Sequence, residues 1–323
     1  MLLDSLGGNF TTPAKNFVTT TNTSLNSEAF ALFVDYQNSH SGISNALKSL
    51  AFTLDAKSQS HIVGGSAYDV KASIGLLSKH TGLLFDPITM SEIPQETYSF
   101  GIETEIDENN DFAAYVYTSA ESSMGNTKGA GVALGFNQDA HKFSLGVSFM
   151  QENGTSLGML NGGLDHGVES MTTALDFGYS GIISDNLSFG ASAQIGSMTS
   201  NSQGIWGDQT NTNFSAYGIE FNFSIVFSDN DKLVASLRQP IAIDSGTMRV
   251  TLPHSRDING NITTKSFDIA LAPAERQLDF GIEYGVLIDK NETIKLGAAY
   301  LLNSANVSGD ISVNVALSYT LNF

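Results

Sequence analysis

The residues of this chain that could carry out catalysis are few and scattered. The triplet Gly154-Thr155-Ser156 has a form found around some serine nucleophiles. Nucleophilic catalysis also needs a base that a third group orients, and no Asp and His blocks accompany the triplet in order. The six histidines stand singly, without the spacing of metal ligands, and the chain has no cysteine. We therefore expect no catalytic residue, no metal site and no cofactor.

Two further motifs have simpler structural interpretations. The glycines between Gly129 and Gly135 alternate with other residues at a period of two, whereas a dinucleotide loop lies at a strand-to-helix turn. The acidic run from Asp107 to Asp111 could bind Ca²⁺ weakly, but a solvated hairpin turn fits it better. Neither motif predicts a ligand site.

The remaining candidates are isolated charges that alternate with large apolar residues. Burying such charges is costly unless each is paired or hydrated, so their surroundings should hold water or a polar plug. The simpler alternative is that they only keep a water-filled lumen hydrated. Ten residues are predicted to face a lumen: Asp69, Lys71, Glu103, Glu105, Asp176, Glu220, Arg238, Asp279, Glu283 and Lys295.

The elements that must position these charges are β-strands. From Ile311 to Phe323 every odd position is large and apolar, and every even position is small or polar. A period of two places these two sets on opposite faces of one strand. The pattern recurs in eleven or twelve segments without an intervening long helix after about residue 97, which predicts an all-β antiparallel fold. The segments lie near 68–76, 98–106, 112–118, 130–136, 143–149, 175–179, 187–195, 217–227, 233–237, 278–288, 294–302 and 311–323.

The connections between these segments alternate between short and long. Short turns on one rim and long loops on the other are typical of outer-membrane barrels. If 231–253 and 263–288 are single very long strands, the count closes at a 12-stranded antiparallel transmembrane β-barrel. A soluble β-sandwich or β-helix also alternates, but the Gly, Ser, Asn and Ala opposite the apolar face suit a narrow lumen better. The short turns are predicted at Asp107–Asn110, Gln138–His141, Ser184–Asn186, Ser228–Asp231 and Asp289–Asn291.

Composition excludes several classes of protein. Charged residues make up 15% of the 323 residues, against about 25% in ordinary soluble domains, and the formal net charge is −18. Such a charge argues against nucleic-acid binding, because neutralising phosphates needs clustered Lys and Arg. No segment approaches the ~18 consecutive apolar residues of a membrane-spanning helix. Met1–Asp4 lacks the features of a signal peptide, so we expect an exported form to be a mature chain or a fragment.

The first sixty residues follow a different pattern. Residues 1–26 include a Thr/Asn-rich stretch with Pro13 that predicts an extended linker. The spacing of Ile43, Ala46, Leu47, Leu50, Ala51 and Leu54 is helical and predicts a short α-helical segment within 27–62. This helix could lie inside the pore of a barrel formed by 63–323, or on the surface of its short-turn rim.

A barrel that follows a helix-bearing linker and ends in Phe resembles the translocator domain of classical (type V) autotransporters. The segments Leu237–Gly246, Val250–Pro253 and Leu271–Asp279 are similar to barrels attached to subtilisin-like serine proteases of proteobacteria. The resemblance implies a bacterial outer-membrane location, contact with outer-membrane lipid, a linker helix in the pore, and export of an N-terminal passenger whose end would be residues 1–26. It also implies that any protease activity lies in a passenger outside this chain.

In that family the barrel assembly machinery reads the terminal strand. By resemblance, this assembly signal corresponds to Val315, Leu317, Tyr319, Leu321 and Phe323. The alternative function is a passive outer-membrane porin with an acidic lumen, which would need no passenger.

Overall fold

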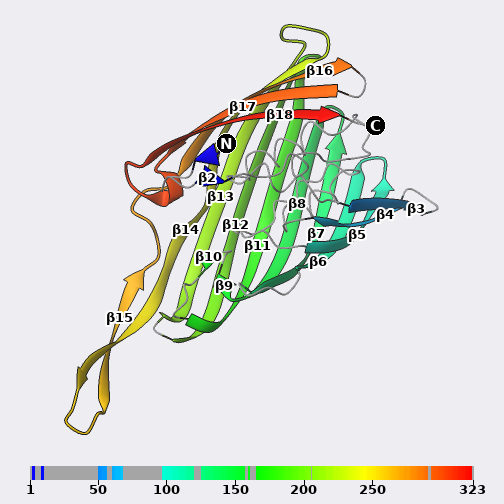
Figure 1. Cartoon of the computed structure of the whole chain (residues 1–323). Helices are drawn as coiled ribbons and strands as arrows, with labels where there is room; N and C mark the ends of the chain where they lie inside the picture. Colours follow the sequence, from blue (N-terminus) through cyan, green and yellow to red (C-terminus); the bar gives the residue numbers. More distant parts are fainter. Residues whose placement is uncertain are drawn as a thin grey trace.

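The computed structural model describes residues 2–3, 9–10, 50–56, 60–67, 97–119, 125–156, 159–160, 165–204, 206–289 and 292–321. Within these ranges the protein is all-β, as predicted, and one large sheet contains fourteen strands (Figure 1). Every strand pair in the sheet is antiparallel.

The bounds of the strands show how the chain passes through the sheet. Its strands are β3 (Leu50–Ala56), β4 (Ser60–Ala67), β5 (Thr97–Asp107), β6 (Asn110–Ser119), β7 (Asn126–Gln138), β8 (His141–Asn153), β11 (Asp165–Ser184), β12 (Leu187–Gly204), β13 (Trp206–Ser224), β14 (Asp231–Arg256), β15 (Ile262–Ala270), β16 (Leu278–Asp289), β17 (Glu292–Leu302) and β18 (Ile311–Leu321). Two short pairs, β1 (Leu2–Leu3) with β2 (Asn9–Phe10) and β9 (Thr155–Ser156) with β10 (Met159–Leu160), lie outside it.

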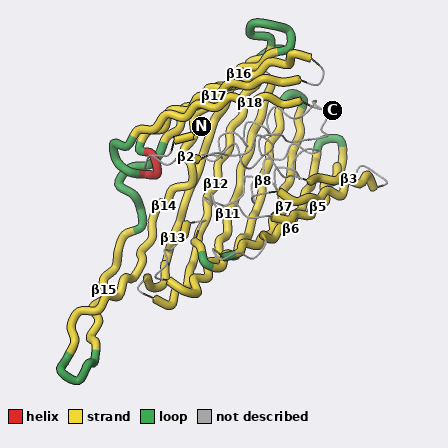
Figure 2. Tube along the Cα trace, viewed as in Figure 1, coloured by secondary structure: helices red, strands yellow, loops and turns green. Residues whose placement is uncertain are grey.

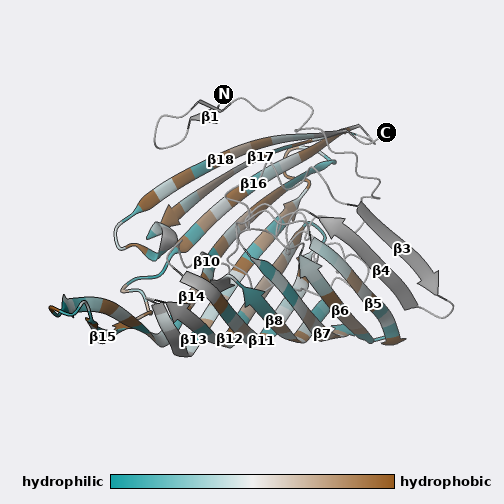
Figure 3. Ribbon diagram, turned by 60° about the horizontal axis from the view of Figure 1, so that its bottom comes forward, coloured by the Kyte–Doolittle hydropathy of each residue, from teal (hydrophilic) through white to brown (hydrophobic). Residues whose placement is uncertain are grey.

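Neighbouring strands of the large sheet follow the order of the sequence. If β15 and β16 are counted as one interrupted strand, β4 to β18 number twelve, as predicted, although β4 precedes the predicted first segment at 68–76; β3 adds one at the edge. The sheet curls into a trough, with β3–β5 along one side and β16–β18 along the other (Figure 3). Among the described residues no ladder joins the two edge strands, β3 and β18.

The N-terminal edge corrects the prediction of a helix. Leu50–Ala56 is a strand paired with β4, so the part of the expected helical segment that includes Leu50 and Leu54 is wrong. Leu50, Phe52 and Leu54 also alternate at a period of two, and pairing with β4 favours that period. Residues 60–62 of the expected helical segment are likewise strand, in β4, while 27–49 and 57–59 lie outside the described residues, as do residues 68–76 of the predicted first strand. No helix in the described ranges has the length and apolar character needed to cross a membrane.

Tight turns join β5 to β6, β7 to β8 and β11 to β12 at one rim, as predicted, and Figure 2 draws the turns in green. The connection from β13 to β14 is longer, at 225–230, and residues 290–291 of the turn predicted at Asp289–Asn291 lie outside the described residues. The turn between β5 and β6 explains the acidic run there. The Asp107 carboxylate accepts hydrogen bonds from the backbone N–H of Asn109 at 2.8 Å and from the side-chain amide of Asn110 at 2.7 Å. The Asn110 amide is the main cause of an Asp107 pKa below its ordinary value. The carboxylate thus stabilises its own turn, as expected of a hairpin.

The two predicted very long strands have different outcomes. β14 is a single strand of 26 residues, as predicted. Its first part pairs with β16 and its last part with β15, so 263–288 is divided at 271–277. Pro273 cannot donate to a ladder. The guanidinium of Arg276 turns to Asp244, with Nη2 2.5 Å from Oδ1, and anchors the connecting segment on β14.

The β14–β15 hairpin extends beyond the rest of the sheet as an arm (Figure 1). Its polar side carries the Arg249–Asp268 salt bridge, 3.0 Å long, and a Thr251–Ser266 hydrogen bond of 2.8 Å. Asp257 organises its tip by accepting hydrogen bonds from the backbone N–H groups of Asn259 and Asn261 and from the Asn261 side chain.

The tip of the arm should loosen in acid. The pKa of Asp257 is lowered, chiefly by the Asn261 side chain and then by its backbone N–H. Because the folded pKa is depressed, the stabilisation is complete above the ordinary carboxylate pKa of about 3.9 and is lost as pH falls through the lower folded value. Amide exchange, expressed as protection factors of Asn259 and Asn261, should show this loss below about pH 4. The Asp257→Asn variant should show no such step, and a step of equal size in that variant would contradict the assignment.

Candidate functional site

The outer face of the sheet, defined by Leu134, Leu145 and the residues in register with them, is covered by exposed apolar side chains. Their exposed fractions range from 39% for Leu134 to 70% for Val315. On many strands they alternate with buried residues; over the first six residues of β5, for example, Thr97, Ser99 and Gly101 are buried, and Tyr98, Phe100 and Ile102 are exposed. Figure 3 shows the resulting alternation of brown and teal along the ribbons. A soluble monomer rarely exposes a contiguous apolar surface of this extent.

The apolar band crosses the strands obliquely. Phe149 of β8 lies opposite Thr173 of β11, which lies opposite Ser197 of β12, so the band has ended on β12 at that level. Phe189 of β12, inside the band, lies opposite Gly181, beside the His141 turn. Strands of membrane barrels tilt by about 35–45° to the barrel axis, and a level membrane would trace such a diagonal across them.

Aromatic rings line the short-turn edge of this band. The ring centroids of Phe143 and Tyr179 are 5.0 Å apart, those of Tyr179 and Phe189 are 5.9 Å apart, and those of Phe189 and Phe221 are 5.1 Å apart. The row therefore runs across four strands, from β8 to β13. Such a row is typical of the aromatic girdle at a lipid–water boundary.

The inner face, opposite this band, contains an apolar cluster that the sequence analysis missed. Its large members are Tyr115, Tyr117, Met150, Met198, Phe214, Ile241 and Ile243, none more than 9% exposed. Glycines on the next strands make room for three rings: Tyr117 lies over Gly129, Tyr115 over Gly131 and Phe214 over Gly196. The sequence did contain an indication of this cluster, because residues 112–118 carry apolar side chains at both even and odd positions, and hence on both faces of the strand.

Most of the predicted charges lie on this inner face. Asp176 is 8% exposed and accepts hydrogen bonds from Ser148 at 3.0 Å and Gln194 at 2.5 Å. Glu103 is buried at the same level of the sheet, separated from Asp176 by the small residues Ala113, Ala133 and Gly146.

The other predicted charges gather on β13, β14, β16 and β17. Glu220 accepts a hydrogen bond from Asn222 at 3.0 Å, and Arg238 lies opposite Asp279, which accepts one from Gln277 at 2.8 Å. The Nζ atom of Lys295 lies 3.8 Å from Oε1 of Glu283, which makes a salt bridge. Glu105 is exposed near the short turns, and Asp69 and Lys71 lie outside the described residues.

Several inner-face groups were not predicted. Lys142 bridges to Asp111 at 3.1 Å, and Glu152 accepts a hydrogen bond from Ser170 at 3.2 Å. Among the buried side chains of the described ranges, eight are Asp or Glu and none is Lys or Arg. All of these carboxylates except Asp231 lie on the inner face, so the inner wall is acidic. Its cations Lys142 and Lys295 are each 24% exposed.

Comparisons with known proteins give structural likenesses only. No protein-family model matches the chain, and no curated protein matches it. The toluene transporter TodX of Pseudomonas putida is similar over 72% of this chain and 75% of its own, at 10% identity and a TM-score of 0.41. The translocator domain of the autotransporter NalP from Neisseria meningitidis covers 85% of both chains, at 13% identity and a TM-score of 0.28. A TodX deltaS2S3 mutant, a monoaromatic hydrocarbon channel, covers 85% of this chain and 88% of its own, at 11% identity and a TM-score of 0.30.

Proposed function

We propose that this chain is the translocator barrel of an autotransporter in a bacterial outer membrane, which anchors and helps export an N-terminal passenger. The observation that carries the membrane assignment is the oblique band of exposed apolar side chains on the outer face. In hydrocarbon every backbone N–H and C=O must be paired, and antiparallel ladders on both sides achieve this for the strands that lie between the edge strands β3 and β18. No reaction chemistry is needed for this role.

The last strand supports assembly from a free edge. Val315, Leu317 and Tyr319 are 70%, 69% and 56% exposed on one face of β18, the edge strand of the sheet. An unpaired edge can accept another strand by main-chain hydrogen bonds, as an assembly machinery would require. Leu321 ends β18, and Phe323 lies outside the described residues. We propose that these five positions form the signal that the barrel assembly machinery reads.

Export can be tested with an epitope fused to the N-terminus. In intact Gram-negative cells the epitope should become accessible to added protease, while a periplasmic marker stays protected. The similarity of Leu237–Gly246 to protease-linked barrels favours a subtilisin-like passenger as the natural cargo. If the barrel assembles in the membrane and the epitope stays inside, the translocator role is wrong and the membrane assignment survives.

The acidic inner wall favours one alternative, a passive porin that selects cations. Seven carboxylates buried on the inner face, with no Lys or Arg among the buried side chains of the described residues, would attract cations into an open lumen. Single-channel recording of the intact chain separates the two functions: a translocator plugged by its N-terminal region should conduct poorly. Deleting residues 1–49, which stops before β3, should then raise the conductance. A large cation current from the intact chain, unchanged by the deletion, would support the porin instead.

A further inference from the structure

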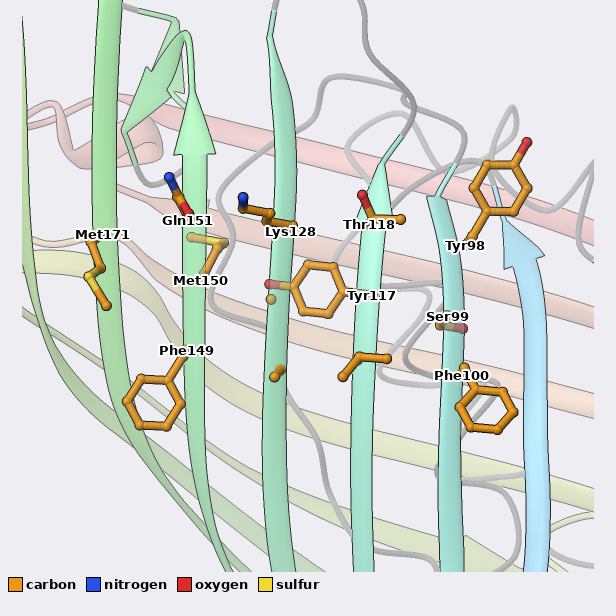
Figure 4. A pocket seen from close by; sticks show the side chains of 13 residues that line it. Tyr98, Ser99, Phe100, Tyr117, Thr118, Lys128, Phe149, Met150, Gln151 and Met171 are labelled. Atoms are coloured by element: carbon orange, nitrogen blue, oxygen red, sulfur yellow. The ribbon is translucent and has the colours of Figure 1, made fainter.

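A groove of about 660 Å³ lies on the outer face, across β5 to β11 (Figure 4). A row of apolar residues in register forms its walls and floor: Phe100, Val116, Ala130 and Phe149. The small Ala130 and Gly129 on β7 give it depth between the two phenylalanine rings. On the inner face of the sheet, the Tyr117 ring covers Gly129. The floor is therefore apolar and sealed, and the groove is open toward the surroundings of the outer face.

The end of the groove nearer the long connections carries polar groups on β5 to β8, beside the exposed Met171 of β11. Tyr98, Thr118, Lys128 and Gln151 form the next row in register on the same four strands, and Figure 4 shows them beyond the phenylalanine rings. Lys128 is exposed and forms no salt bridge with another described residue. Only two residues between Thr97 and Ser224 are Lys or Arg, and the other, Lys142, is paired with Asp111 on the inner face.

A cation at this place is unusual in a chain of net charge −18. It lies at the boundary between the apolar band and the polar strand ends, where a lipid head group would lie if the outer face contacts a bilayer. Its neighbours Thr118 and Gln151 can donate hydrogen bonds to the same anion. The apolar half of the groove continues from this point along the strands, in the direction that an acyl chain would take from its head group.

From this arrangement we propose that the groove binds a lipid whose head group carries a phosphate, in the leaflet on the long-loop side of the sheet. Lys128 contacts the phosphate, and an acyl chain lies on Ala130 between Phe100 and Phe149. The proposal rests on the proposed membrane location of the outer face.

The test uses the full chain purified in detergent, with bound lipid measured by native mass spectrometry. The probe is diphosphorylated lipid A, compared with its dephosphorylated form. The wild-type chain should retain the phosphorylated lipid in preference. Lys128→Gln should weaken its retention about tenfold, the effect of losing one charge-assisted contact, and should leave the dephosphorylated lipid unaffected. Ala130→Phe, which fills the groove, should weaken both lipids.

Lys265→Gln is the matched control, because it removes the same charge from the arm, where Lys265 lies opposite Leu252. It should bind lipid as the wild type does, and far-UV circular dichroism should show that all variants are folded. Inorganic phosphate at the lipid concentration should displace nothing. Equal retention of both lipids, an unaffected Lys128→Gln variant, or displacement by free phosphate would overturn the proposal. A chain that stays monodisperse without detergent would instead overturn the membrane location itself.

Discussion

Leu145→Arg is expected to lower the free energy of unfolding in a lipid bilayer by about 2–4 kcal/mol, the cost of Arg on the lipid face near the bilayer midplane. Leu145 is 43% exposed on the outer face and lies in register between Leu134 and Phe177. If that face met water, the same substitution would be an ordinary surface change, within about 0.5 kcal/mol. Urea titration of the chain folded into phospholipid vesicles measures the difference.

Thr199→Arg is the control for this prediction. Thr199 is exposed on the outer face of β12, opposite Met171 and beyond the end of the apolar band. Near the interface the cost of Arg falls to about 0–1 kcal/mol, so this variant should stay close to the wild type. Equal stabilities of the Leu145 and Thr199 variants would mean that the band does not contact hydrocarbon, and the proposed secretion role would fail with it.

The second large effect on stability is expected for Gly196→Ala, on the inner face of the sheet. A Cβ at position 196 would lie 2.6 Å from the carbonyl oxygen of Thr173 and would overlap the ring of Phe214. The oxygen belongs to β11, whose ladder with β12 would have to shift, and Phe214 is only 1% exposed. Overpacking of this kind costs about 1–3 kcal/mol, which should appear as a lower urea midpoint and a smaller folded fraction.

Gly285→Ala provides the matched comparison on β16. There the nearest atom to an added Cβ is Cγ of Lys295, 3.5 Å away, which is ordinary van der Waals contact. Its stability should equal that of the wild type or slightly exceed it, since alanine restricts the unfolded chain more than glycine does. If both alanine variants lost the same stability, the loss would come from alanine itself and not from the crowding around Gly196.

Periodicity predicted the strands and turns well because both are local. Alternation decides which side chains share a face, and Asp-containing turns mark where a strand reverses, so β5 to β14 follow the expected segments. Two features needed information from outside the segment. Leu50–Ala56 fits both a helical and an alternating period, and only its partner β4 decides between them. The connecting segment 271–277 is held by the Arg276–Asp244 salt bridge to another strand, a contact that the pattern within one segment cannot predict.

The inner face was predicted only in part for the same reason. Parity indicated that Asp176, Glu220 and Asp279 share a face, but their hydrogen-bond partners are set by the register between strands. The Lys142–Asp111 bridge joins residues on β8 and β6, which a single-strand pattern cannot align. The apolar cluster likewise depends on glycines of one strand facing rings of the next. Alternation along a strand therefore indicated which described charges share a face, but not the environment of each charge.

The diagonal course of the apolar band has a geometric consequence for the two ends of the sheet. Each step from one strand to the next moves the apolar band slightly toward the short-turn rim. This shift accumulates between β5 and β18. If a seam joined the first and last strands, they would meet out of step by several residues, the stagger that ties strand tilt to diameter in a closed cylinder. Lengthening or shortening the wall by one hairpin would change that stagger and the width of the passage together.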